Sequence, residues 1–315
     1  MGVRTEITTK LGGVSVIIPT RNRPALLLAA LHSVLRQTRP VDQIIVVDDG
    51  TDAREWPQAI EELSPLIEVI HRSPSEGVAA ARNHGLGRAR GNYLLFLDDD
   101  DLIDPRFVEQ GLAVLGANPQ AGGVFFRYRT VVLTVPHDGE IPAEAPALPW
   151  RLAIAENPVP RTTLEQNPVT AFLRYLIPIH SGLIHRATVG TARFPESLRQ
   201  GEDTYFWISL AAAGKRFVLD EHAYAIIRRH AHNTTQSRAA YMCEIQPCYE
   251  RLLADGLLSA TGDSFLAHLK LLCFKILTGG ASLRPNLAQA IRSPHRLASE
   301  LGFWTRNFTT RLLRI

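Results

Sequence analysis

The sequence predicts an α/β fold in which a doubly wound, mostly parallel central sheet carries helices on both faces. Short continuous runs of mostly β-branched residues, such as VSVII at residues 14–18, are typical of strands buried on both faces. Segments with helical spacing of apolar residues separate these runs. Polar or acidic loops follow three of the runs, and in open α/β sheets ligands bind beyond the carboxyl ends of the strands. The alternation therefore predicts one ligand crevice at that edge of the sheet.

The first half of the chain is expected to supply the parallel strands. After the strand Val14–Ile18, Pro24 suits the first position of a helix, because a proline there removes no intrahelical hydrogen bond. Further strands are expected at Ile44–Val47, Leu66–His71 and Asn92–Leu97, and helices at Asp52–Leu63 and Val78–Arg90. Each of these strands is separated from the next by a helix, as parallel connections require.

The second half is expected to extend this sheet and then to become helical. A helix after Pro105, strands at 123–135, 179–186 and 223–230, and a helix at 201–213 complete a first domain of residues 1–235. Within it, residues 136–178 are rich in proline and lack periodicity, so we expect an irregular insert beside the site. Residues 236–315 return to helical spacing and form a predicted C-terminal helical extension.

Composition indicates a globular protein of a reducing compartment. The 315 residues are 45% hydrophobic and 21% charged, which is ordinary for a chain that folds around its own core. Three cysteines without zinc-site spacing argue against a disulfide framework. We expect neither a signal peptide at the amino terminus nor a membrane-spanning helix, and hence a cytoplasmic location.

Charge is distributed unevenly along the chain. From Lys270 to the end, eight basic residues accompany Glu300 alone, so this tail carries a net charge of +7 within a total of +3. Such a tail favours an anionic partner. By charge alone, an anionic membrane surface and a nucleic acid are both compatible.

Four consecutive aspartates, Asp98–Asp101, follow the predicted strand 92–97. Adjacent carboxylates repel one another, so we expect a cation among them. Oxygen ligands suit Mg²⁺ or Mn²⁺, which complete their coordination with phosphate oxygens and water. The alternative is a solvated acidic loop that caps the helix near Pro105, since carboxylates favour helix amino termini. That alternative explains one aspartate but not four after a buried strand, so the pattern favours a divalent metal with a phosphorylated ligand.

Asp48 and Asp49 end the second predicted strand and need a different role. A carboxylate at this edge can accept a hydrogen bond from a base N–H or a ribose hydroxyl, which would distinguish a nucleotide from a bare phosphate. A plain turn capped by Thr51 or Asp52 is the alternative for the sequence DDGT.

Four further residues are candidates for chemistry. Arg82 either reaches the crevice to neutralise a diphosphate or faces solvent on its helix. Glu202 and Asp203 either complement the dipole of the helix that they open or supply a general base. His230, in the sequence RRHAHN, is either a surface histidine or a metal ligand.

Together these segments resemble the family 2 glycosyltransferases, which have the GT-A fold. Five motifs carry the resemblance in the family's order and spacing, from Val14 to His232: VSVIIPTRNRP, QIIVVDDGT, SEGVAAARNHGLGRARGNYLLFLDDDD, GEDTYFWISLAAAGKRF and RRHAHN. The resemblance implies transfer of a sugar from a nucleoside diphosphate sugar, with UDP-sugars favoured, to an acceptor hydroxyl. It further implies inversion, a divalent Mn²⁺ or Mg²⁺, and a place in cell-envelope polysaccharide or glycoconjugate synthesis.

The resemblance also implies roles for individual residues. The nucleotide-sugar would be bound by Pro19, Thr20, Asn22, Asp48, Asp49, Arg82, Asp98 and Asp99. Asp98 and Asp100 match the two ends of a D-x-D element and would bind the metal together with His230. Asp203 matches the general base, with Glu202 beside it.

The basic tail lies outside the resemblance. We expect it either to contact an anionic membrane at the inner face of the cytoplasmic membrane, near a saccharide or lipid-linked acceptor, or to form a helical cap or homodimer contact. We expect no nucleic acid partner. Two other functions compete: a sugar-nucleotide-binding protein without catalysis, and a nucleotidyltransferase. The latter should show a glycine-rich phosphate loop after the first strand, where this chain has PTRNRP.

Overall fold

The computed structural model describes residues 12–132, 151–153, 159–175, 177–229, 238–259 and 263–277. The chain divides into two compact units, Met1–Thr234 and Thr235–Ile315.

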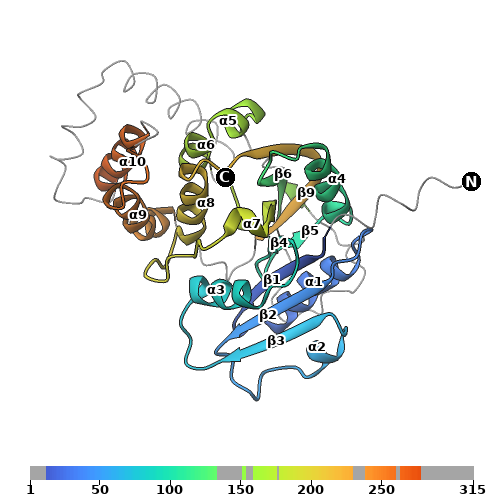
Figure 1. Ribbon diagram of the computed structural model, residues 1–315. Coiled ribbons are helices and arrows are strands. Elements are labelled where there is room, and N and C mark those ends of the chain that lie inside the picture. Colours follow the sequence, from blue (N-terminus) through green and yellow to red (C-terminus); the bar gives the residue numbers. More distant parts are fainter. Residues whose placement is uncertain are drawn as a thin grey trace, which may run out of the picture. The chain divides into compact units, whose positions relative to one another are not determined.

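A nine-stranded mixed sheet forms the centre of the first unit (Figure 1). Its strands are hydrogen-bonded in the order β3-β2-β1-β4-β8-β6-β9-β5, and β7 pairs with β6 off this path. The strands are β1 (Val14–Thr20), β2 (Gln43–Asp49), β3 (Ile67–Arg72), β4 (Tyr93–Phe96), β5 (Leu102–Ile103), β6 (Gly123–Val132), β7 (Arg151–Ala153), β8 (Gly182–His185) and β9 (Phe217–Arg229).

Strands β1 to β4 form the parallel part of the sheet. Ile17 in β1 pairs with Ile45 of β2 on one side and with Phe96 of β4 on the other. Strand β3 continues the parallel pairing along β2. All seven residues of β1 and of β2 are buried, which agrees with the mostly β-branched runs at their centres. The loops that follow these strands consequently lie at one edge of the sheet.

Helices cover both faces of the sheet, so the predicted α/β class is confirmed. Ile18 of β1 belongs to the same core cluster as Leu27. Ile17 faces the other side of the sheet. A Cβ on Gly85, in the helix Val78–Arg88, would lie only 2.4 Å from Ile17 Cγ2, so this helix packs very closely against β1. The helices are α1 (Pro24–Leu35), α2 (Ala59–Glu62), α3 (Val78–Arg88), α4 (Phe107–Ala117), α5 (Arg161–Gln166), α6 (Pro168–Arg174), α7 (Arg186–Val189) and α8 (Glu202–Ala212).

The other part of the sheet mixes directions. Strand β8 runs antiparallel to both β4 and β6, whereas β6 and β9 are parallel. Strand β5, directly after the four aspartates, pairs with Ala225 and Ile226 of β9. Its two residues are too few to show periodicity in the sequence. This short pairing joins the aspartates to the end of β9.

Two sequence predictions differ from the structure. The helix expected over Asp52–Leu63 is the single turn α2, because Pro57 lacks an N–H and restricts the residue before it. Residues 136–178, expected to be irregular, include β7, α5 and α6. Pro168 is the first residue of α6, where a missing N–H costs nothing, and does not act as a helix breaker.

The described part of the second unit consists of α9 (Arg238–Ala254) and α10 (Ser264–Leu277). Lys270 Nζ donates a hydrogen bond of 2.9 Å to the Tyr249 hydroxyl. Cys243 is exposed and Cys248 is buried, and neither forms a disulfide within the described residues. Within the described ranges, no helix has the length and apolar character needed to cross a membrane. The basic sequence FWTRNFTTRLLRI lies outside the described residues.

Candidate active site

The structure brings together the polar loops that follow β1, β2 and β4. Thr20 Oγ1 donates to Asp99 Oδ2 over 2.7 Å, which joins the end of β1 to the aspartate loop, Asp98–Asp101. The Asn22 N–H donates to Thr51 Oγ1 over 2.9 Å, which joins the loops after β1 and β2. Asn22 adopts a φ of 54°, a conformation that asparagine tolerates better than most residues.

Asp48 is buried at the end of β2 and hydrogen-bonded on both oxygens. Oδ1 accepts from the Thr51 N–H over 3.0 Å, and Oδ2 lies 3.0 Å from His71 Nδ1. The hydrogen bond to Asp48 raises the pKa of His71.

Asp49 is also buried, and its carboxylate holds the start of α3. It accepts hydrogen bonds from Ser75 Oγ over 2.6 Å and from the N–H groups of Gly77 and Glu76 over 2.8 and 3.0 Å. Burial tends to raise the pKa of Asp49, but these hydrogen bonds outweigh it and lower the pKa. Asp49 thus has a structural role, in addition to any contact with a nucleotide.

Arg82 connects two acidic segments across the first unit. The side chain of Arg82, on α3, is buried, with 3% of the residue exposed. Its Nη2 lies 2.6 Å from Asp98 Oδ1 and its Nη1 lies 2.6 Å from Glu202 Oε1. The guanidinium also lies 5.5 Å from the centre of the Phe194 ring. The predicted arginine thus points into the site instead of into solvent.

Glu202 and Asp203 are placed by the first turn of α8. Gly201 precedes them with a φ of 80°, which favours glycine, and turns the chain into the helix. Asp203 Oδ1 accepts from the Thr204 N–H over 2.6 Å. Loss of hydration raises the pKa of Asp203 to about 7, and the Glu202 carboxylate adds to the effect. A carboxyl group that titrates near neutral pH suits general acid–base chemistry.

Two arginines that the sequence analysis did not single out offset the negative charge of the aspartate loop. Arg23 Nη1 lies 3.1 Å from Asp100 Oδ2 and 3.4 Å from Asp99 Oδ1. Arg228, at the end of β9, is 1% exposed and donates to the main-chain carbonyls of Asp99 and Asp100. Even so, burial and the neighbouring Asp100 raise the pKa of Asp99 to about 7.

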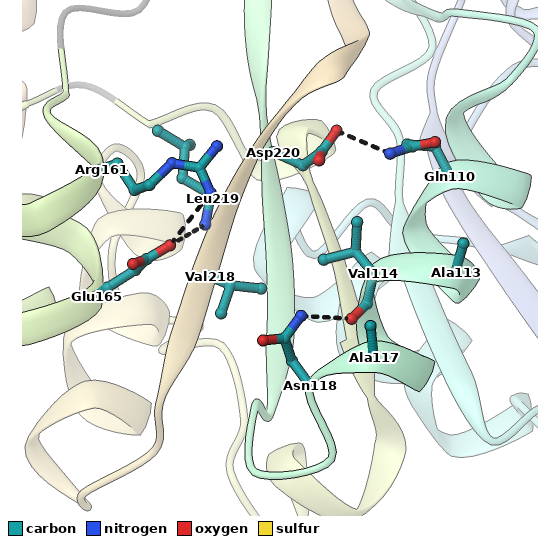
Figure 2. Close-up of a pocket in the computed structure, with 10 residues that line it drawn as sticks. All are labelled: Gln110, Ala113, Val114, Ala117, Asn118, Arg161, Glu165, Val218, Leu219 and Asp220. Carbon is teal, nitrogen blue, oxygen red and sulfur yellow. Dashed lines mark hydrogen bonds and ion pairs between the residues drawn. The ribbon is translucent and has the colours of Figure 1, made fainter.

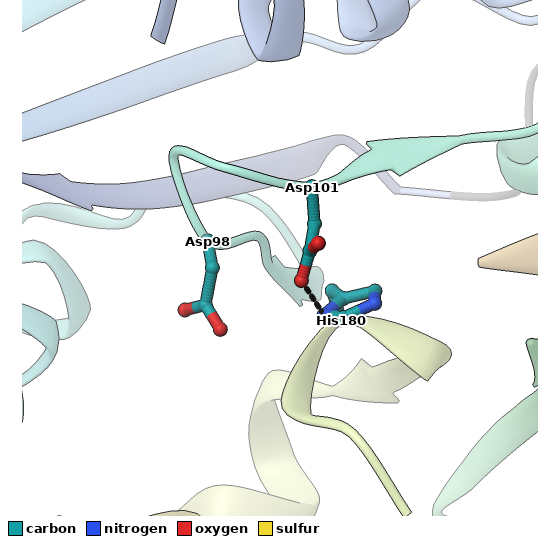
Figure 3. Close-up of side chains that lie close together, drawn as sticks. All are labelled: Asp98, Asp101 and His180. Carbon is teal, nitrogen blue, oxygen red and sulfur yellow. Dashed lines mark ion pairs between the residues drawn. The ribbon is translucent and has the colours of Figure 1, made fainter. Parts of the chain in front are cut away.

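Asp98, Asp101 and His180 form a cluster whose ligand atoms lie within 4.8 Å of one another (Figure 3). His180 belongs to the 3₁₀ turn Ile179–Ser181 before β8, and its Nδ1 lies 3.1 Å from Asp101 Oδ2. Burial lowers the pKa of His180 to about 4 and raises the pKa of Asp101 well above its usual range. Carboxylate oxygens beside a neutral imidazole can bind a divalent transition ion.

Some predicted site residues lie elsewhere or outside the described part. Pro19 is buried within β1, where it pairs with Val47 of β2. His230 lies outside the described residues. Asp101 is one of the four aspartates expected to surround a cation but was not named as a ligand, and His180 was not singled out. The signal for His180 is a histidine in the apolar run LIPIHSGLI, which a search for motifs does not detect.

A concave surface that contains none of these site residues lies elsewhere in the first unit. It has a volume of about 440 Å³ and opens beside α4, α5 and β9 (Figure 2). Gln110 donates to Asp220 over 3.3 Å, Arg161 lies 3.7 Å from Glu165, and Asn118 donates to the main-chain carbonyl of Val114 over 2.8 Å. None of the predicted site residues lines this hollow, so the candidate chemistry belongs to the aspartate loop.

Comparison with protein families identifies the family of this chain. Residues 15–174, just over half of the chain, match the family described as Glycosyl transferase family 2. The chain therefore belongs to glycosyl transferase family 2, as its motifs predicted.

Curated relatives match parts of this chain. An uncharacterised glycosyltransferase of Rickettsia conorii is 30% identical over 208 residues, which are 63% of this chain and 30% of that protein. TuaG of Bacillus subtilis, named for teichuronic acid biosynthesis, is 42% identical over 90 residues, 28% of this chain and 36% of that protein. WcaA of Escherichia coli, named for colanic acid biosynthesis, is 36% identical over 102 residues, 32% and 37% of the two chains. The chain spans about a third of the length of these relatives.

Solved structures share the fold at low sequence identity. Staphylococcus aureus TarS in complex with UDP has a TM-score of 0.54 and 19% identity, over 83% of this chain and 70% of that one. The mannosyltransferase PcManGT of Pyrobaculum calidifontis, in complex with GDP-Man and Mn²⁺, has a TM-score of 0.58 and 18% identity, over 97% and 85% of the two chains. These likenesses confirm the predicted GT-A fold.

Proposed function

We propose that this chain transfers a sugar from a nucleoside diphosphate sugar to an acceptor hydroxyl with inversion at the anomeric carbon. The observation that carries the proposal is the buried ion-pair chain Asp98–Arg82–Glu202, whose two links are each 2.6 Å long, with Asp203 next to it in the sequence. It combines a cation suited to a departing diphosphate with a carboxyl group suited to proton transfer. The family membership supports the same reaction class.

The donor nucleotide is proposed to bind at the ends of β1 and β2. Thr20 and Asn22 shape the loop after β1, while Asp48 and Asp49 accept hydrogen bonds from base and ribose. Uracil is the favoured base, and the UDP and UDP-GlcNAc complexes of TarS support this choice. PcManGT was solved with GDP-Man, so guanine is the first alternative to test.

A divalent ion, Mn²⁺ or Mg²⁺, fits the aspartate loop. The loop offers closely spaced carboxylates, and the His180 imidazole beside them is buried without a hydrogen bond among the described residues. Asp98 belongs to both candidate ligand pairs, with Asp100 from the sequence and with Asp101 from the structure. The sequence adds His230 as a third ligand. When bound, such an ion would stabilise negative charge on the diphosphate, and the Mn²⁺ complex of PcManGT supports it.

The protein's own residues account for the remaining chemistry. The acceptor oxygen forms a bond to the anomeric carbon, and the bond from that carbon to the diphosphate oxygen breaks with its electron pair. Asp203 takes the proton of the acceptor hydroxyl. Arg82 neutralises charge that develops on the diphosphate, and Glu202 holds Arg82 in place through their 2.6 Å contact.

Donor binding and turnover test this function. A thermal-shift screen of UDP-, GDP-, dTDP- and CDP-sugars, each with Mn²⁺, Mg²⁺ or EDTA, should show one base that stabilises the protein in a metal-dependent way. Transfer or donor hydrolysis should follow with that donor, and NMR of the product should show inversion. Equal binding in EDTA would contradict the metal. Tight binding without hydrolysis or transfer would indicate the alternative, a sugar-nucleotide-binding protein.

The setting is proposed to be cell-envelope polysaccharide or glycoconjugate synthesis, as the names of TuaG and WcaA suggest. The +7 charge of the tail supports peripheral docking on anionic lipid at the inner face of the cytoplasmic membrane, near a saccharide or lipid-linked acceptor. Flotation with anionic vesicles, but not with neutral ones, is the expected result. A concentration-dependent dimer that does not float would favour a homodimer contact through the C-terminal helices.

A further inference from the structure

His180 is a buried polar side chain in an unusual environment. The residue is 2% exposed, and neither Nδ1 nor Nε2 makes a hydrogen bond within the described part of the chain. Nδ1 lies 3.1 Å from Asp101 Oδ2, yet the two groups lack hydrogen-bond geometry. Leaving a buried polar group without a hydrogen bond is unfavourable, because its lost hydration is not replaced. Buried groups of this kind call for an explanation, and one explanation is a bound ion.

The two carboxylates of the cluster are held by other groups. Asp98 Oδ1 accepts from Arg82 Nη2 over 2.6 Å, and Asp101 Oδ1 accepts from the Arg228 N–H over 2.9 Å. Each contact uses one oxygen and fixes the orientation of the carboxylate. Figure 3 shows both carboxylates on the same side of the loop, with the His180 ring beside Asp101. Both aspartates are therefore set in place before any ion binds.

The spacing of these atoms is close to that of octahedral coordination. For metal–ligand bonds of about 2.1 Å, neighbouring ligands lie roughly 3.0 Å apart and opposite ligands roughly 4.2 Å apart. The distance between His180 Nδ1 and Asp101 Oδ2 is 3.1 Å, and the three ligand atoms lie within 4.8 Å of one another. Small adjustments of the side chains would bring all three atoms to one ion.

We infer that Asp98, Asp101 and His180 bind the metal ion of this site, so that His180 supplies its imidazole ligand and Asp101 its second carboxylate. This inference rests on the proposed function, since it concerns the metal of the same site. It replaces Asp100 and His230 in the ligand set expected from the sequence. Asp100 instead lies 3.1 Å from the guanidinium of Arg23.

Exposure indicates where the donor would approach such an ion. The side chain of Asp98 is 32% exposed, whereas those of Asp101 and His180 are 8% and 2% exposed. The ion would therefore be enclosed by protein on one side and open toward Asp98, where diphosphate oxygens complete its coordination. An imidazole ligand also favours a transition ion, so Mn²⁺ should bind more tightly than Mg²⁺.

Pulsed EPR of the full chain with Mn²⁺ and no nucleotide tests the ligand set directly, because a coordinated imidazole gives a nitrogen modulation. We expect this modulation in the wild type, its loss in His180→Gln and its retention in His230→Gln. Titration with Mn²⁺ should show an affinity at least about tenfold lower in His180→Gln and in Asp101→Asn. His222→Gln is the matched control, because that side chain is 73% exposed and pairs with Asp220.

Three results would overturn the inference: no nitrogen modulation in the wild type, loss of the modulation in His230→Gln but not in His180→Gln, or a larger loss of Mn²⁺ affinity in Asp100→Asn than in Asp101→Asn. Circular dichroism establishes that each variant is folded. If His180→Gln does not fold, the wild type and His230→Gln still decide between the two histidines. Sugar transfer without a nitrogen signal would refute His180 as a ligand and leave the proposed function intact. A nitrogen signal that is lost in His180→Gln, without any sugar transfer, would support His180 as a ligand and refute the proposed function.

Discussion

The aspartates that end β2 and those that follow β4 look alike in the sequence but lie in different electrostatic surroundings. Asp49 accepts three hydrogen bonds from Ser75, Glu76 and Gly77, and its pKa is lowered. Asp99 and Asp101 have raised pKa values, because burial and neighbouring carboxylates oppose their charge. The first group is stabilised by donors of a single nearby loop, whereas the second depends on arginines from distant parts of the chain.

This difference distinguishes a carboxylate that mainly holds the backbone from carboxylates that are candidates for metal binding or catalysis. A carboxylate that is satisfied by fixed N–H groups gains little from a ligand. Carboxylates that repel each other in a buried site gain strongly from a cation, and such perturbed groups cluster at functional sites. Substitutions near β4 and α8 should consequently have larger effects than substitutions at the end of β2.

The largest effect is expected for Asp203→Asn. Loss of the general base should reduce turnover by about 10³-fold or more, while donor affinity changes by less than about threefold, because the side chain keeps its shape and acts on the acceptor. Steady-state kinetics and calorimetry with the donor measure the two quantities. Asp255→Asn, a surface change that involves the ion pair with Arg251, is the control. Normal turnover in Asp203→Asn would exclude this residue as the base.

Arg82→Met should cause the largest loss of stability. It leaves Asp98 and Glu202 without their shared buried cation, which should lower the free energy of unfolding by about 3–5 kcal/mol. Arg88→Met on the same helix is the matched control, with an expected loss below about 1 kcal/mol, because Arg88 is 63% exposed in its pair with Glu68. Urea denaturation measures both values.

A double variant sharpens this comparison. Adding Glu202→Gln to Arg82→Met removes one of the two unpaired charges, so part of the lost stability should return. No recovery would mean that packing, for example against Phe194, dominates the role of Arg82.

The pH dependence of activity should reflect Asp203. Its pKa is raised to about 7, so the deprotonated form that acts as a base is lost as the pH falls through 7. We expect kcat/KM to fall about tenfold per pH unit below that value, since kcat/KM reports groups of the free enzyme. The residual activity of Asp203→Asn should lack this slope. A profile for the wild type that stays flat down to pH 5 would contradict the raised pKa.

The smallest effect is expected for Asp49→Asn. The variant weakens the hydrogen bonds that hold the loop before α3, so the free energy of unfolding should fall by about 1–2 kcal/mol. Urea denaturation and nucleotide affinity should be measured together. A more than tenfold loss of nucleotide affinity at unchanged stability would show that Asp49 acts mainly on the nucleotide. The proposed difference between Asp49 and the aspartates after β4 would then be wrong.

Much of the parallel sheet was predictable because its signals are local. Buried strands such as β1 and β2 are centred on runs of β-branched residues, and Pro24 starts α1 as expected. Strand β5 was not predictable, because its two residues form a strand only by pairing with β9. The helices α5 and α6 were missed because prolines at their starts resemble breakers when the tertiary packing is unknown.

The edge of the sheet that carries the polar loops and the candidate carboxylates could be predicted from the sequence, since strand runs and acidic motifs are patterns among neighbours in the chain. The partners of these carboxylates depend on the tertiary structure. Arg82 meets Glu202 across 120 residues, and the Arg228 N–H meets Asp101 across 127. The proposal that Asp101 and His180 bind the metal together with Asp98 rests on the closeness of these three side chains in space, which the sequence does not show. Burial and ion pairing depend on distances in space, and those distances follow from the way the whole sheet assembles.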